Sequence, residues 1–95
     1  MDSTFYIDIT LKTPGGLESF GKFFVGNHRE KARTIFQQLQ GSTDVNEKNV
    51  MYISFMETKN GLPLNVDMIT CTLNELGENC KIITKELFKM HALSL

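Results

Sequence analysis

The chain of 95 residues has few cysteines, no excess of charge of either sign and no long hydrophobic run. Two cysteines are too few for a disulfide framework, and cysteine and histidine together never assemble the close ligand set of a structural zinc site. Ten Lys and Arg against eleven Asp and Glu give a formal net charge of -1, so the basic excess of a dedicated nucleic-acid or anionic-membrane binder is missing. Because no apolar run reaches about 18 residues, we expect no contact with a membrane.

The N-terminus lacks the features of a secretory signal peptide. It begins Met-Asp-Ser-Thr-Phe-Tyr, with neither a basic segment nor an apolar one. Hydrophobic residues make up 41% of the chain, an ordinary share for a soluble globular protein. We therefore expect a cytoplasmic protein that forms a single domain over residues 1–95, with no metal ion and no cofactor.

The first half of the sequence predicts two strands and a helix. Over residues 4–12, apolar residues alternate with polar ones in the period-two pattern of a half-buried strand, at Phe5, Ile7, Ile9 and Leu11. Proline and two glycines then mark a turn, and we expect a second strand at residues 17–25. Asn27 followed by Glu30 predicts a capped helix start, and Gly41 is the expected stop.

The second half repeats this order of elements. Strands are expected at residues 50–58 and 64–73, joined by a turn at Asn60-Gly61, the strongest short hairpin signal. Apolar residues then recur at spacings of three and four, as on one face of an amphipathic helix, at Leu76, Cys80, Ile83, Leu87 and Met90.

Together these elements predict an α+β fold, a two-layer ββαββα domain. It has a four-stranded antiparallel sheet with two helices on one face. The repeated order suggests an internal ββα duplication with halves at residues 1–41 and 48–95, since Tyr6-Ile7 matches Tyr52-Ile53 at an offset of 46. Chance similarity between two amphipathic hairpin–helix units is the alternative.

Two patterns of chemical interest favour a structural interpretation. The residues from Gly16 to Lys22 fit the GxxxxGK pattern of a phosphate-binding loop. However, Phe23 stands where that loop needs a hydroxyl, and the segment is strand-like. Asp8 and Asp67 fall on strands, where solvent-facing carboxylates are common. We therefore predict no catalytic residues.

The start of the first helix is a candidate anion-binding site. Asn27, His28 and Arg29 lie where the N–H groups of a helix N-terminus attract anions, and Arg29 is placed to bind one. An ordinary Asn cap on a solvated helix is the alternative.

The faces of the sheet carry the main functional expectation. If both hairpins have two-residue turns, the face turned away from the helices carries about seven apolar side chains, namely Tyr6, Phe23, Val50, Tyr52, Met56, Ile69 and Cys71. Two helices cover only one face of such a sheet, so another molecule should cover this patch. Lys22 falls beside Ile7 on the apolar face. An inward-pointing lysine protects an edge strand, so we expect the second strand at an edge.

These observations predict a non-enzymatic module that self-associates or binds a protein partner. We expect a homodimer packed through this sheet face, with Tyr52 near the centre of the contact. A small dimeric ligand-binding protein or enzyme with a pocket between sheets is the first alternative. Single-stranded nucleic-acid binding on the open sheet face is the second, which the near-neutral charge disfavours.

Overall fold

The elements follow one another in the order strand, strand, helix, repeated once. The computed structural model describes residues 3–43 and 49–93, with side chains described as far as Met90. The elements are β1 (Ser3–Thr13), β2 (Gly16–Phe24), α1 (Arg29–Gln37), β3 (Met51–Lys59), β4 (Leu62–Cys71) and α2 (Leu73–Leu93). This order confirms the one predicted from the sequence.

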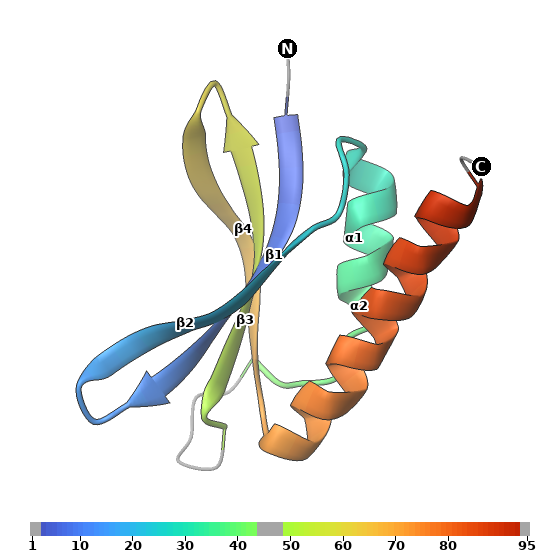
Figure 1. The fold of residues 1–95 in the computed structure, drawn as a ribbon. Coiled ribbons are helices and arrows are strands. Elements are labelled where there is room, and N and C mark those ends of the chain that lie inside the picture. Colours follow the sequence, from blue (N-terminus) through green and yellow to red (C-terminus); the bar gives the residue numbers. More distant parts are fainter. Residues whose placement is uncertain (1–2, 44–48, 94–95) are drawn as a thin grey trace.

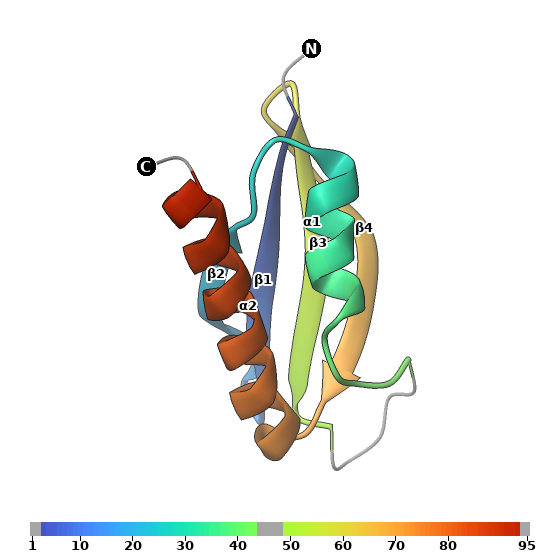
Figure 2. The same cartoon turned by 90° about the vertical axis from the view of Figure 1, so that its right-hand side faces the viewer.

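The four strands form one antiparallel sheet in the order β2-β1-β3-β4. The two hairpins lie side by side, so β1 and β3 are central and β2 and β4 are edges. Both helices lie on the same side of the sheet (Figure 1), and the turned view places them in front of it (Figure 2). The predicted α+β class is confirmed. Within the described residues, neither α1 nor α2 is long and apolar enough to cross a membrane.

Both hairpins close with the predicted two-residue turns. Thr13 pairs with Gly16 in the first hairpin, and Lys59 pairs with Leu62 in the second. Asn60 and Gly61 have φ values of 54° and 80°, the positive values that a type I′ hairpin turn requires at both central positions. The turns therefore set the strand pairing next to them as expected.

A bulge in β2 changes the pairing farther from the first turn. Lys12 opposes Leu17 as predicted, but the register shifts between Ile9 and Thr10. Phe20 is the extra residue on β2, since the partners of Ile9 and Thr10 are the residues on either side of it. A shift of one residue exchanges the two faces of a strand, so every β2 residue beyond Phe20 points to the face opposite to the predicted one.

The second hairpin contains an equivalent bulge. The register of β3 and β4 shifts between Phe55 and Met56, and Val66 is the extra residue. Val66 and Phe20 lie 46 residues apart, the same offset that relates Tyr6 to Tyr52. This equality fits the predicted duplication, which stays a prediction.

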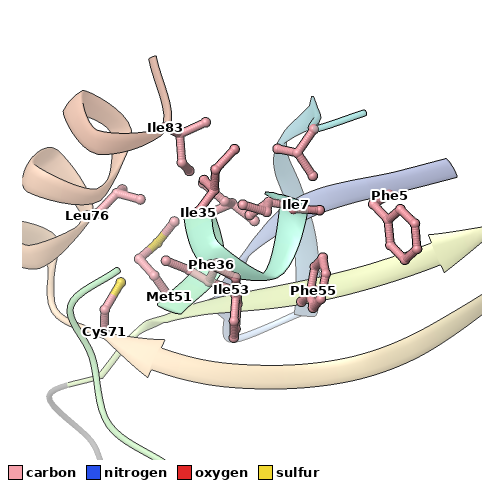
Figure 3. Packing of buried hydrophobic residues seen from close by; sticks show 13 residues of the cluster. Phe5, Ile7, Ile35, Phe36, Met51, Ile53, Phe55, Cys71, Leu76 and Ile83 are labelled. Carbon is pink, nitrogen blue, oxygen red and sulfur yellow. The ribbon is translucent and has the colours of Figure 1, made fainter. Parts of the chain in front are cut away.

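The hydrophobic core fills the space between the sheet and the helices (Figure 3). The ring of Phe55 stacks on two others, with centroids 5.9 Å from Phe5 and 5.4 Å from Phe36. Because these rings come from β3, β1 and α1, the stack joins the two layers. The other buried apolar members are Ile7, Ile9, Val25, Ala32, Ile35, Met51, Ile53, Cys71, Leu76 and Ile83.

Both ends of α1 differ from the predicted ones. His28 is the N-cap and makes no side-chain cap hydrogen bond, so the prediction that Asn27 caps the helix is wrong. The first helical bond runs from the Ala32 N–H to the His28 carbonyl, which leaves Asn27 one residue too early. Gly41 does not stop the helix, which ends at Gln37. Instead, a Cβ at Gly41 would lie only 2.6 Å from the Thr70 carbonyl oxygen, so this close approach requires glycine.

α2 begins at Leu73, three residues before Leu76, the first residue of the predicted apolar face. A capping box that the periodicity did not show starts the helix there. The Thr72 N–H donates to Glu75 Oε1 at 2.9 Å, and the Glu75 N–H donates to Thr72 Oγ1 at 3.2 Å. This reciprocal pair satisfies two N–H groups at the helix start. It also ends β4 at Cys71 rather than at residue 73.

A buried amide holds the segment after α1 against α2. Asn79 is fully buried. Its Oδ1 accepts a hydrogen bond from the Gln40 N–H at 2.6 Å, and its Nδ2 donates to the Gln40 carbonyl at 2.8 Å. Both polar atoms of the side chain are therefore paired with one backbone position, which fixes the path of the chain from α1 toward β3.

Candidate functional site

The face of the sheet that points away from the helices (Figure 1) is called the open face below. It carries a row of apolar side chains. Phe24, Tyr6 and Met56 are direct neighbours on β2, β1 and β3. Phe24 is 58% exposed, and the other two are half-buried. In the next row, Asp8 and Ser54 are polar, so the open face is mixed.

Three of the predicted interface residues do not belong to this face. Phe23, Ile69 and Cys71 oppose buried residues of β1 and β3 on the side that the helices cover. The expectation that they point away from the helices is wrong, because the bulges in β2 and β4 shift each strand by one residue. Val50 packs against the core just before β3. The open face is consequently less apolar than the sequence predicts.

Tyr52 lies on the open face as predicted, but its neighbours are polar. It sits between Thr10 and Thr70 in its row. The Thr70 hydroxyl accepts from Asn49 Nδ2 and donates to the Ser42 carbonyl, both at 3.1 Å. This end of the open face is therefore built around hydrogen bonds, and the apolar row lies four residues away along the strands.

Lys22 also lies on the other face from the predicted one. It opposes Asp8 on the open face, and its Nζ lies 4.7 Å from the centroid of the Tyr6 ring. An ammonium at this distance is attracted by the ring face. The misfit that suggested an edge position is therefore absent, although β2 is indeed an edge strand.

Exposed large apolar side chains gather on the two edge strands. On β2 they are Leu17 (60%), Phe20 (58%) and Phe24 (58%), and on β4 they are Leu62 (67%), Leu64 (50%) and Met68 (38%). None of the nine residues of β2 is buried. The apolar surface of the sheet is thus displaced from its centre toward its edges.

Of the predicted anion-binding residues at the start of α1, Arg29 already forms an ion pair within the chain. Arg29 Nη2 lies 2.9 Å from Glu57 Oε1, and the Glu57 side chain is only 6% exposed. The guanidinium also lies over the Phe5 ring at 5.5 Å. Asn27 and His28 are exposed. Arg29 thus balances a carboxylate of this chain, which a buried acid requires.

The acidic and thiol groups of the sheet are not brought together as a reactive site. Asp8 and Asp67 lie on β1 and β4, with β3 between them. Burial, and to a smaller extent the nearby Glu75 carboxylate, raise the pKa of the Cys71 thiol from 9.0 to about 11, so the thiolate that reacts is disfavoured. Within residues 3–43 and 49–93, no three His, Cys, Asp or Glu side chains gather closely enough to hold a metal ion.

Two shallow hollows lie on the helical layer. One, of about 570 Å³, follows α2 and is lined by Cys80, Lys81, Thr84, Lys85 and Phe88. The other, of about 370 Å³, lies where α1 meets α2. Neither contains a residue of the open face. No protein-family profile matches the chain, and neither a curated protein nor a solved structure is significantly similar to it.

Proposed function

We propose that the protein is a non-enzymatic self-associating module, a homodimer whose contact surface is centred on β2 and continues onto the open face. The observation that carries this proposal is the exposure of β2. None of its nine residues is fully buried, and three of its four large apolar side chains, Leu17, Phe20 and Phe24, are exposed. Phe24 continues into the apolar row of Tyr6 and Met56. A soluble monomer rarely leaves such a row in water, whereas the core of a protein interface is enriched in aromatic residues.

The centre of the proposed contact differs from the one expected from the sequence. Tyr52 has threonines on both sides, whereas Phe24 has Tyr6 beside it and Met56 beyond. Apolar contact with a second copy therefore gains more at β2 than at the middle of β3. Phe24 also belongs both to the apolar row and to the exposed edge, so it is the residue to change first.

The test compares two exposed apolar residues on opposite edges of the sheet. We expect the wild type to be a dimer by light scattering at tens of micromolar and Phe24→Glu to be a monomer, because an unpaired carboxylate in an interface costs several kcal/mol. Leu62→Glu is the matched control, because Leu62 is 67% exposed, against 58% for Phe24, but lies on β4. It should remain dimeric. Circular dichroism should be unchanged in both, since neither side chain is buried.

Three results would contradict the proposal. A wild type that stays monomeric at these concentrations would exclude self-association and leave a different protein as the cover. A Phe24→Glu variant that stays dimeric would place the contact away from β2. A dimer that Leu62→Glu splits instead would place it on β4.

A further inference from the structure

The bulge in β2 puts exposed apolar side chains near both ends of the strand on the same face of the sheet. Leu17 and Phe24 lie seven residues apart, and regular alternation would put them on opposite faces of the strand. Because Phe20 is an extra residue between them, both lie on the open face, Leu17 opposite Lys12 and Phe24 opposite Tyr6. β2 therefore presents an exposed apolar side chain near each end of the same face.

The outer edges of the two edge strands differ in their hydrogen bonding. β4 contains Pro63, which has no N–H. In addition, Ser42 and Thr70 exchange two backbone hydrogen bonds of 2.8 Å along the outer edge of β4. β2 has no proline, and in the described part of the chain no segment other than β1 pairs with it.

The lysine of β2 does not shield its edge. A charged side chain that projects past an edge strand prevents another strand from adding to it. Lys22 instead lies across the sheet, with Nζ over the Tyr6 ring of the neighbouring strand. The unpaired N–H and C=O groups of β2 are therefore accessible to an added strand, which is one of the recurring ways in which proteins bind extended segments.

From these features we propose that the second copy binds edge to edge, with the two β2 strands antiparallel around a twofold axis perpendicular to the sheet. In this register Leu17 faces Phe24 of the partner subunit, and Ser19 faces the partner's Lys22. All four positions lie on the open face, as directly opposed residues must. The inference rests on the proposed function, because it names the geometry of the same contact.

We identify the partner as a second copy of this chain, because β2 is complementary to itself in this register. A twofold contact requires a surface complementary to itself, and β2 meets this condition since its two exposed apolar positions exchange places under the rotation. Like charges do not meet, because Lys22 faces a serine. The apolar row of Met56, Tyr6 and Phe24 then continues across the junction onto the partner's Leu17, in one eight-stranded sheet.

Disulfide trapping tests this register. The double variant Ser19→Cys/Lys22→Cys should form a covalent dimer under mild oxidation, since opposed strand residues lie within reach of a disulfide. Each single variant should not, because its two copies of one position would be about 10 Å apart along the strands. The matched control is Asn65→Cys/Met68→Cys on β4, which has the same spacing around the equivalent bulge and should remain monomeric on a non-reducing gel.

The outcomes separate this geometry from the proposed function. If light scattering shows a dimer but the Ser19→Cys/Lys22→Cys variant forms no disulfide between copies, the edge-to-edge geometry is wrong. Self-association then still holds, with face-to-face packing of the two sheets. Trapping by the β4 control, but not by the β2 pair, would assign the contact to the opposite edge. If wild type and both double variants are monomeric by light scattering and untrapped, the proposed function fails as well.

Discussion

Replacing Asn79 by alanine should reveal how much the α1–β3 connection depends on one buried amide. The side chain is fully buried and makes hydrogen bonds of 2.6 and 2.8 Å to the backbone of Gln40. Each such bond contributes about 1 kcal/mol net, and truncating a buried side chain adds a packing loss. We therefore expect Asn79→Ala to lower the free energy of unfolding by about 2 to 4 kcal/mol. That is a large share of the 5–15 kcal/mol typical of folded proteins.

Urea denaturation followed by circular dichroism measures this loss, and amide hydrogen exchange locates it. The Gln40 N–H should exchange faster in the variant because its acceptor is gone. Asn74→Ala is the matched control: Asn74 lies on the same helix but is exposed, so its loss should change stability by less than about 0.5 kcal/mol. Equal stability of the two variants, or an unchanged exchange rate at Gln40, would refute the anchoring role.

Two further outcomes follow from the helix start and from the thiols. Asn27→Ala should lower the free energy of unfolding, measured by urea denaturation, by less than about 0.5 kcal/mol, whereas losing a true N-cap costs about 1 kcal/mol. The larger loss would contradict the assignment of His28 as the cap. Since the pKa of Cys71 is raised from 9.0 to about 11, the folded state keeps a proton that the unfolded state releases. Stability should thus fall as the pH rises from 9 to 11. Cys71→Val should lessen that fall, and an alkylating reagent at pH 8 should modify half-buried Cys80 before Cys71.

The element order could be predicted because hydrophobic periodicity and turn residues are local signals. The strand registers could be predicted only as far as the bulges, since a bulge depends on how two strands fit together. In the first hairpin, the predicted position of Lys22 was the one sign of a bulge in the sequence. A lysine predicted on an apolar face, next to a glycine within a strand, is also what a one-residue bulge produces. The residues around Val66 contain no comparable signal.

The helix starts show a similar division. Thr72 and Glu75 form a capping box that can be read directly from the sequence, and the apolar spacing drew attention to Leu76 instead. By contrast, Asn27 and Glu30 have the same spacing but no cap forms. Pairing of β1 with the chain around Gly26 fixes where that segment enters the helix. Such tertiary constraints override a local motif and are not visible in one sequence.

The seam between β1 and β3 has a consequence for the order in which the chain folds. Within each hairpin, the partners next to the turn lie only three residues apart in the sequence. Partners across this seam lie from 40 residues (Leu11 and Met51) to 56 residues (Ser3 and Lys59) apart. Closing a long loop costs entropy before any contact compensates for it. The hairpins should consequently form early as independent units. Their docking, which stacks Phe5 on Phe55, should set the folding rate, so truncating either ring should slow folding more than it speeds unfolding.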